Sequence, residues 1–403
     1  MKQIQGGVCA AKGFTASGIH CGIRKNKTKK DLALIYTPQR AAAAAVYTTN
    51  LVKGAPITVT KANIADGYAQ AMLCNSGNAN TCNADGVMIA EAMCAHLAEE
   101  LKISAKDVIV ASTGVIGQRL DITPIAQGIP ALVSALGDCS ADAAEGIMTT
   151  DTKRKEIAFS FEAGGKTCRI GGIAKGSGMI HPNMATMLVF LTTDVAIAPA
   201  FLQKALQEDV KTSFNRVSVD GDTSTNDMVS ILANGLAGNP KIESEGPDYD
   251  AFCEALHAVT VYLCRMIARD GEGATKLLEC KVSGAKDEAE AETVAKSVIC
   301  SSLFKAAMFG SDANWGRVLC AIGYSGANVD VNCIDVSFAS KKGRIDVCQN
   351  GAGIDFSESA AKEILLEEEI QVLIDLKAGP ASATAWGCDL TYDYVKINGD
   401  YRT

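Results

Sequence analysis

The sequence predicts a mixed α/β fold, because short apolar runs bounded by glycine alternate with longer amphipathic segments. The chain has 403 residues, of which 48% are apolar and 21% charged, as in ordinary globular proteins. That length favours two domains, with three as the alternative. Helical and strand-like segments are interspersed without a regular strand–helix–strand rhythm, and no GxGxxG follows a strand. A doubly wound parallel sheet is therefore not favoured.

Five segments have apolar residues at the spacing of an amphipathic helix. They cover residues 87–101, 199–214, 249–268, 288–309 and 357–369. The third segment is the clearest of the five, because a single apolar stripe runs along it. The stripe consists of Phe252, Leu256, Val259, Leu263 and Ile267.

Strands are predicted where short apolar runs are bounded by turn residues. They cover residues 32–36, 43–48, 70–74, 107–111, 187–192, 343–347 and 371–375. Residues 394–398 alternate in the manner of a strand, so a further strand is expected near the C-terminus. Residues 239–250 contain two prolines and a glycine, which indicates an exposed connection.

The bulk composition argues against several classes of partner. The net charge of −8 is spread along the chain with no basic stripe, and only 5% of the residues are aromatic. Nucleic acid and anionic membranes are therefore poor candidates. The longest apolar runs are too short to span a bilayer, and the N-terminus lacks the apolar core of a signal peptide. We expect a soluble, cytoplasmic protein.

Fifteen cysteines raise the question of disulfides or a metal site. Their number is odd, they are scattered, and no CxxC pair occurs. We expect most of them to be buried, reduced thiols that behave as small apolar side chains, and we expect no metal.

Residues 175–190 are the most informative stretch of the chain. A glycine-rich turn leads into an apolar strand, and Thr186 stands at the junction. A hydroxyl group needs a base to become a nucleophile, and an N-terminal residue carries such a base in its own α-amine. The pKa of a free α-amine is about 7.7–8, so modest desolvation leaves it neutral. Cleavage between Ala185 and Thr186 would place this threonine at an N-terminus.

Two other interpretations of this stretch remain open. A threonine at the start of a buried strand is commonly structural. His181 lies five residues before Thr186 and could act as an acid or base, in a chain with four histidines.

Residues 220–227 resemble a calcium loop at first sight. The sixth position is Thr225 instead of glycine, and the twelfth is Ile231 instead of glutamate. We therefore expect a hydrogen-bonded turn near the active site.

The chain resembles the ornithine acetyltransferase (glutamate N-acetyltransferase) family from end to end. The resemblance is carried by residues 6–8, 12–14, 29–34, 75–80, 112–117, the Thr186 stretch, 220–227 and 312–317. It implies a layered αββα-type sandwich, of the kind found in self-cleaving aminopeptidases. It also implies cleavage at the Ala185–Thr186 bond into chains 1–185 and 186–403, with assembly as a heterotetramer of two copies of each.

The implied activity is transfer of an acetyl group from N2-acetyl-L-ornithine to L-glutamate in arginine biosynthesis. In the implied ping-pong mechanism, Thr186 carries the acetyl group while Thr113 and Gly114 form the oxyanion hole. No cofactor is implied, although acetyl-CoA is a second acetyl donor in bifunctional members. The remaining substrate-binding positions, besides Thr186 itself, are Thr152, Lys175, Glu272, Asn398 and Thr403.

Without the resemblance, these positions have ordinary interpretations. Thr113 and Gly114 end a strand, Lys175 is a solvated cation, and Glu272 follows a helix end. Lys175 suits the α-carboxylate of an amino acid. The family usually has a small residue where His181 stands. Two rival functions also remain: a hydrolase with water as the acceptor, and a binding protein in which Thr186 is structural.

Overall fold

The computed structural model describes residues 1–181 and 187–400. Ala185, Thr186 and Thr403 lie outside the described residues. The chain divides into two compact units, which are described separately. Unit 1 comprises Met1–Gly176, Pro182–Asn215 and Thr223–Leu263, and unit 2 comprises Ser177–His181, Arg216–Asp222 and Cys264–Thr403. These units differ from the two chains that cleavage would produce, and the cleaved chains stay a prediction.

Unit 1 is built on a mixed sheet whose strands, among the described residues, follow the order β1-β6-β7-β8-β10-β3-β4-β5, with β2 paired to β3. Their bounds are β1 (Lys2–Ile4), β2 (Thr15–Ile19), β3 (Leu32–Tyr47), β4 (Tyr68–Asn78), β5 (Val108–Val115), β6 (Lys155–Ala163), β7 (Lys166–Lys175), β8 (Leu188–Thr193) and β10 (Met228–Ala233). The helices are α1 (Ala55–Asn63), α2 (Gly86–Leu101), α3 (Thr123–Ser134), α4 (Ser140–Ile147), α5 (Pro199–Thr212) and α6 (Pro247–Arg269), with short 3-10 turns at Gly7–Cys9, Ala105–Asp107 and Phe214–Arg216.

Strand β3 joins two segments that the sequence predicts as separate strands. Its pairing with β4 shifts in register between Tyr36 and Ala41, around an exposed stretch that contains Pro38. Proline has no N–H to donate to a ladder, so it is tolerated only where pairing is interrupted. Both halves pair with β4, but only the second half pairs with β10. The strand therefore links the two parts of the sheet.

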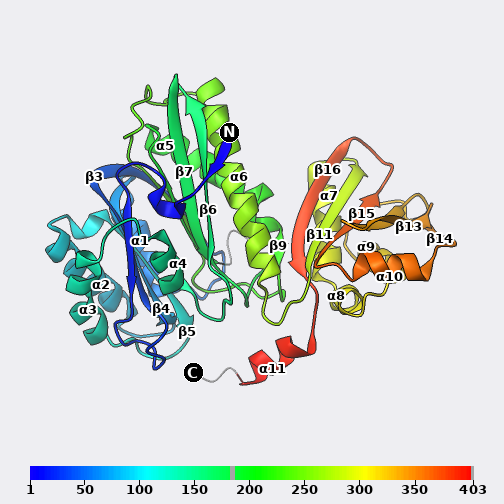
Figure 1. Cartoon of the computed structure of the whole chain (residues 1–403), viewed down its shortest axis with the longest axis horizontal. Coiled ribbons are helices and arrows are strands. Elements are labelled where there is room, and N and C mark those ends of the chain that lie inside the picture. Colours follow the sequence, from blue (N-terminus) through cyan, green and yellow to red (C-terminus); the bar gives the residue numbers. More distant parts are fainter. Residues whose placement is uncertain (182–186, 401–403) are drawn as a thin grey trace. The chain divides into compact units, whose positions relative to one another are not determined.

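Apolar side chains on both faces of this sheet produce a layered sandwich. On one face of β3, β4 and β5, Leu34, Leu73 and Val110 pack against α2 and α3. On the other face, Ala43, Met72 and Ile109 share a buried core with Ile173, Phe190 and Leu232 of β7, β8 and β10. Helix α6 covers the outer side of β6 and β7 (Figure 1). This order of layers confirms the αββα prediction.

The predicted stripe on α6 is buried along its whole length, since each of its five residues is 0% exposed. Phe252 contacts Phe161 of β6, and Gly172 of β7 leaves room for Val259 and Leu263. By length and composition alone, α6 could cross a membrane, although no apolar run in the sequence is long enough to predict a span. Half of the most apolar stretch of α6 is buried inside the protein. The core helix of a soluble protein can have the same length and apolar composition, so this finding is weak evidence for a membrane span.

Unit 2 contains, among the described residues, a sheet in the order β14-β13-β12-β15-β11-β16-β9. Its strands are β9 (Val217–Ser218), β11 (Leu277–Ala285), β12 (Asp335–Ser340), β13 (Gly343–Gln349), β14 (Ala352–Gly353), β15 (Glu369–Asp375) and β16 (Ala381–Cys388). Its helices are α7 (Glu288–Cys300), α8 (Ser302–Phe309), α9 (Trp315–Gly323), α10 (Glu358–Leu365) and α11 (Tyr392–Asp400).

The two faces of the unit 2 sheet differ in polarity because side chains alternate along a strand. On β11, Leu278, Cys280 and Val282 point into a core that α7, α8, α9 and α10 complete. Glu279 and Lys281 belong to the opposite face, where they form an ion pair. That polar face carries an ion-pair network that bears on the candidate site.

Three predictions about secondary structure are wrong in detail. Residues 288–309 form two helices, because Ser301 is extended and its hydroxyl caps α8 by accepting the Phe304 N–H. Residues 357–369 contain α10 and then the start of β15. Residues 394–398 lie in helix α11, where Tyr394 and Ile397 are the half-buried positions. Their spacing of three residues follows a helix and not a strand.

All fifteen cysteines are free thiols. Seven are buried, six are partly buried, and Cys82 and Cys320 are exposed. The prediction that most of them are buried is therefore wrong, because fewer than half are fully buried. Burial raises the pKa of several of these thiols, for example that of Cys94 to about 12. Among the described residues, no group of three or more His, Cys, Asp or Glu side chains is arranged to hold a metal.

Candidate active site

The end of β5 presents the two predicted oxyanion-hole residues. Thr113 is buried, with 8% of its surface exposed, and Gly114 pairs with Gly77 of β4. Gly114 has φ +132°, and a Cβ there would lie 2.3 Å from the carbonyl carbon of Gly77. Because neither that φ nor that approach suits an L side chain, glycine is required. The backbone of β5 is thus fixed where the sequence predicts oxyanion donors.

Asn226 holds this strand end from a distant part of the chain. Its amide donates to the carbonyls of Ala79 (2.6 Å) and Ser112 (2.9 Å). Its carbonyl oxygen accepts from the hydroxyls of Thr81 and Thr225, each at 2.6 Å. The residue immediately before Thr113 is therefore tied to the segment that leads into β10. Asn226 lies in the 220–227 segment, whose sequence pattern did not indicate this contact.

The predicted substrate contacts Thr152 and Lys175 lie close to one buried carboxylate, Asp151. Asp151 Oδ1 accepts hydrogen bonds of 2.7 Å from Lys155 Nζ and from the Gly176 N–H. Burial alone raises the pKa of this carboxyl, but the charges of Lys155 and Lys175 and the Gly176 N–H outweigh burial, so its pKa is lowered. Thr152, the next residue, is exposed. Asp151 thus connects the turn that carries Thr152 to the end of β7.

A second buried carboxyl, Asp227, is only 2% exposed, and its Oδ2 has no hydrogen-bond partner. Burial raises its pKa well above the usual value, and a hydrogen bond with the Ser224 side chain and the Lys175 charge offset this only in part. The next residue, Met228, donates its N–H to the carbonyl of Met187 at 2.9 Å. Met187 follows Thr186 in the sequence. A buried carboxyl with a raised pKa therefore lies beside the start of β8, which local sequence patterns did not reveal.

In unit 2, Glu272 and Asn398 are in direct contact. The Asn398 amide donates to Glu272 Oε2 at 2.8 Å, and the Glu272 N–H donates to the carbonyl of Ser177 at 2.8 Å. A Cβ on Gly178 would lie 2.5 Å from the Glu272 carboxylate. The structure therefore brings together two predicted substrate-binding residues and places them against the glycine-rich turn.

Asp220 anchors that turn. Its carboxylate accepts the N–H groups of Met179 (2.6 Å) and Ile180 (2.8 Å) and the hydroxyl of Tyr394 (3.3 Å). Met179 has φ +56°, a left-handed conformation that costs energy for an ordinary residue and must be held by its surroundings. Asp220 is the first residue of the hydrogen-bonded turn expected at residues 220–227, and its carboxylate binds backbone N–H groups of the glycine-rich turn.

His181, the alternative base, lies in a partly buried polar cluster. Its Nδ1 is 3.1 Å from Ser218 Oγ and 3.5 Å from Cys300 Sγ. Burial, with a contribution from the Lys296 charge, lowers its pKa. The imidazole is therefore neutral near pH 7. A catalytic part for His181 stays a prediction.

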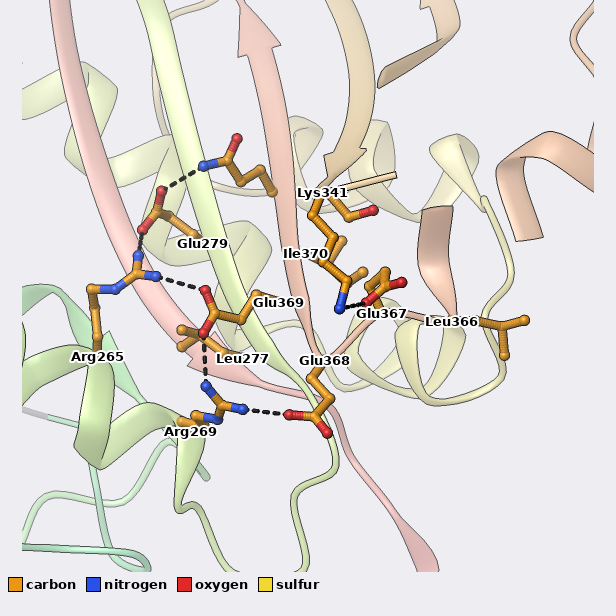
Figure 2. Close-up of a pocket in the computed structure, with 12 residues that line it drawn as sticks. Arg265, Arg269, Leu277, Glu279, Lys341, Leu366, Glu367, Glu368, Glu369 and Ile370 are labelled. Carbon is orange, nitrogen blue, oxygen red and sulfur yellow. Dashed lines mark hydrogen bonds and ion pairs between the residues drawn. The ribbon is translucent and has the colours of Figure 1, made fainter. Parts of the chain in front are cut away.

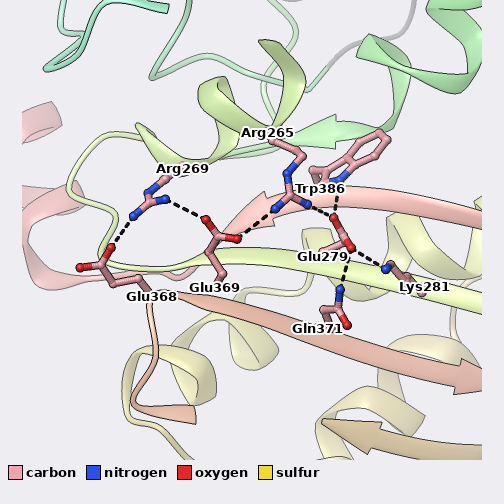
Figure 3. A network of polar contacts seen from close by, with 8 residues as sticks. All are labelled: Arg265, Arg269, Glu279, Lys281, Glu368, Glu369, Gln371 and Trp386. Atoms are coloured by element: carbon pink, nitrogen blue, oxygen red, sulfur yellow. Dashed lines mark hydrogen bonds and ion pairs between the residues drawn. The ribbon is translucent and has the colours of Figure 1, made fainter. Parts of the chain in front are cut away.

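An ion-pair network fixes the end of α6, three residues before Glu272. Arg265 binds Glu279 and Glu369, and Arg269 binds Glu369 and Glu368 (Figure 3). These groups line a pocket of about 700 Å³ (Figure 2). Because the charges that line the pocket bind one another, we interpret the network as an anchor for the Glu272 loop.

The other end of the Glu272 loop is held by Asp389. Its Oδ1 accepts the N–H groups of Thr275 (2.8 Å) and Lys276 (2.9 Å). Gly273 has φ +70°, and a Cβ there would lie 2.6 Å from the Tyr394 nitrogen. The close approach of the loop to the start of α11 therefore requires glycine at this position.

Comparison with known proteins identifies the family. A model of the ArgJ family matches residues 15–403. The chain belongs to the ArgJ family. The arginine biosynthesis bifunctional protein ArgJ of Symbiobacterium thermophilum is 52% identical over 406 residues, and that of Caldanaerobacter subterraneus is 49% identical over 405, each match covering 100% of both chains. The solved ArgJ structure from Bacillus halodurans is 46% identical, covers 53% of this chain and 98% of its own, and has a TM-score of 0.51.

ArgJ membership confirms the family resemblance stated from the sequence, and with it the fold and the class of enzyme, an acetyltransferase of arginine biosynthesis. The roles of individual residues stay predictions. Thr113, Gly114, Thr152 and Lys175 belong to unit 1, and Glu272 and Asn398 belong to unit 2.

Proposed function

We propose that this ArgJ chain transfers the acetyl group of N2-acetyl-L-ornithine to L-glutamate, after it cuts itself between Ala185 and Thr186. The observation that carries the proposal is the full-length match, near 50% identity, to bifunctional proteins of arginine biosynthesis. The fixed strand end at Gly114 and the Glu272–Asn398 pair give that match a chemical basis.

The proposed reaction has two half-reactions. The α-amine of Thr186 accepts the hydroxyl proton while the oxygen attacks the acetyl carbonyl. The Thr113 hydroxyl and the Gly114 N–H stabilise the negative oxygen of the tetrahedral intermediate. The C–N bond breaks, and the leaving amine of ornithine takes the proton. The amine of glutamate then attacks acetyl-Thr186, which releases N-acetylglutamate and restores the hydroxyl.

Charged groups account for substrate binding in this proposal. Lys175 is a buried cation that suits the α-carboxylate common to both substrates. The Glu272 carboxylate suits the ammonium of ornithine and is oriented by Asn398. Thr152 and Thr403 complete the predicted binding positions.

The length of a solved relative supports self-cleavage. The Bacillus halodurans chain is matched over 98% of its own length yet spans only 53% of this chain. A product that begins at Thr186 would hold residues 186–403, about 54% of the chain by count of its residues. Assembly as a heterotetramer of two copies of each product, in the cytoplasm and without a cofactor, is part of the proposal. Use of acetyl-CoA as a second donor belongs to it as well.

Denaturing mass spectrometry of the purified protein, combined with an acetyl-transfer assay, tests the proposal. We expect two fragments, one beginning at Thr186, and formation of N-acetylglutamate that depends on glutamate. Thr186→Ala should remain intact and inactive. Full activity of that intact variant would refute the nucleophile. Release of acetate without glutamate would instead indicate a hydrolase.

A further inference from the structure

A basic segment of unit 1 stands out on this acidic chain. Residues 24–30 read Arg-Lys-Asn-Lys-Thr-Lys-Lys, while the whole chain has a net charge of −8. Most of this segment is exposed. The expectation that no basic stripe exists is therefore wrong at this position. The cations are concentrated in one short segment, so the net charge of the whole chain does not reveal them.

The basic segment is held in a defined conformation by the buried carboxylate of Asp31, which is 0% exposed. That carboxylate accepts the N–H groups of Cys21 (2.6 Å), Gly22 (3.3 Å) and Arg24 (3.0 Å). Three backbone donors on one carboxylate fix the turn at the base of the segment. The cations therefore extend from a rigid support.

A pocket of about 530 Å³ lies beside the segment. Among its lining residues are the cations Arg24, Lys29, Lys30 and Arg154. Two carboxylates also line it: Asp151, which already accepts bonds from Lys155 and Gly176, and Glu145, which lies 3.7 Å from both Lys30 and Arg154. Lys30 also forms an ion pair with Asp142, which does not line the pocket. Four cations against the two carboxylates of Glu145 and Asp142 still leave the pocket with a net positive charge.

The pocket adjoins two parts of the candidate active site. Thr152 is one of its lining residues. The side chain of Arg24 packs over Gly77, since a Cβ on Gly77 would lie 2.9 Å from Arg24 Cγ, and Gly77 pairs with Gly114. The Arg24 guanidinium also donates to the carbonyl of Met148. A ligand in this pocket would therefore lie next to the predicted oxyanion hole.

We propose that this pocket binds the phosphate groups of a coenzyme thioester that serves as acyl donor. This inference rests on the proposed function and assigns a subsite for its second donor. Several phosphates match this net positive charge better than the two carboxylates of glutamate do. The volume falls within the range of small-molecule sites, about 300–1,000 Å³. No aromatic side chain is among the described residues that line the pocket, so the pocket has no surface on which the bases of a nucleic acid could stack.

The phosphates take no part in the chemistry. The acetyl–sulfur bond breaks as the acetyl–oxygen bond forms on Thr186, and the hydroxyl proton passes through the α-amine to the departing thiolate. Glutamate then accepts the acetyl group as before. Loss of cations in the pocket should therefore weaken binding of the coenzyme donor and leave transfer from N-acetylornithine intact.

The test compares Lys29→Ala/Arg154→Ala with the control Lys211→Ala/Lys342→Ala, which removes two exposed cations elsewhere. Calorimetry measures binding of coenzyme A, and kinetics compare acetyl-CoA, the phosphate-free donor S-acetyl-N-acetylcysteamine, and N-acetylornithine. We expect about a tenfold loss of affinity for coenzyme A and a matching rise in KM for acetyl-CoA in the pocket variant alone. The KM values for S-acetyl-N-acetylcysteamine and N-acetylornithine should change by less than about twofold.

Three results would overturn the assignment: wild-type protein that does not bind coenzyme A, unchanged binding in the pocket variant, or an equal loss for all three donors. Equally tight binding of a short single-stranded RNA would identify a nucleic-acid surface instead. Failure of the proposed function would look different, because wild-type protein would then not transfer acetyl groups from N-acetylornithine to glutamate.

Discussion

Asn398 donates a hydrogen bond of 2.8 Å to the carboxylate of Glu272, although the two residues are 126 positions apart in the chain. The contact joins the exposed terminal helix α11 to the loop that follows α6. The N–H of Glu272 is bound at the same time to the carbonyl of Ser177. The backbone and the carboxylate of Glu272 are therefore each held by a hydrogen bond before any substrate binds.

Replacing Glu272 should weaken binding of the cationic substrate. In Glu272→Gln, the side-chain shape and an acceptor for Asn398 remain, but the negative charge is lost. We expect KM for N-acetylornithine to rise by about tenfold or more, because a charge-assisted contact becomes a neutral one. Asn398→Ala keeps the charge and should have a smaller effect. Steady-state kinetics with both substrates measure this, and an unchanged KM in Glu272→Gln would remove the carboxylate from ornithine binding.

Thr113→Ala should slow acetyl transfer by about a hundredfold while the protein stays folded, since loss of one oxyanion donor typically costs ~3 kcal/mol. Thr113→Ser keeps the hydroxyl and should retain most of the rate. Single-turnover rates of acetylation of the cleaved enzyme give the comparison. If Thr113→Ala transfers acetyl groups as fast as Thr113→Ser, the hydroxyl has no oxyanion role.

Most of the fold follows from local patterns in the sequence, but several elements depend on tertiary packing. Each of the seven strands predicted between residues 32 and 375 overlaps an observed strand, whereas the eighth, predicted at residues 394–398, is helical. Helix α1 was missed because its Ile57–Thr60 stretch is β-branched and locally favours a strand. The helix is stabilised by packing on β5, where the Thr60 hydroxyl donates to the Val110 carbonyl at 2.7 Å. No pattern within the helix itself shows that contact.

In the candidate site, too, some features can be predicted from the sequence and others depend on contacts between distant residues. The resemblance to a family identified Thr113, Lys175 and Glu272. Composition and spacing alone favoured a strand end for Thr113 and solvated charges for Lys175 and Glu272. The residues that hold them act over long separations: Asn226 contacts the Ser112 carbonyl 114 positions away. Asp220 binds the turn about 40 positions earlier, at Met179 and Ile180. Local sequence patterns do not contain that information.

Asp220→Asn should slow self-cleavage, because the backbone N–H groups of Met179 and Ile180 would lose a charged acceptor a few residues before the Ala185–Thr186 bond. An amide accepts such bonds more weakly than a carboxylate does. The time course of fragment appearance after synthesis measures the effect. Tyr394→Phe removes only the third contact of Asp220 and serves as the control. Cleavage at the wild-type rate in Asp220→Asn would show that the anchor does not bear on maturation.

Stability toward acid should depend on Asp151. Its pKa is lower in the folded chain than the value of about 3.9 in an unfolded one, so below that value the unfolded chain binds the proton more readily. Asp151 therefore stabilises the fold above about pH 4, and this stabilisation is lost as the pH falls through the folded pKa.

In Asp151→Asn, the ammonium of Lys155 loses its buried carboxylate, which should cost about 3–5 kcal/mol at pH 7. The difference from wild type should shrink below pH 4, where the wild-type carboxyl begins to lose its advantage. Urea unfolding monitored at pH 7 and at several acidic values measures this. Glu243→Gln breaks the exposed pair with Lys241 and should have little effect on stability. A loss in Asp151→Asn as small as that, or one that stays constant with pH, would mean that the buried pair does not stabilise unit 1.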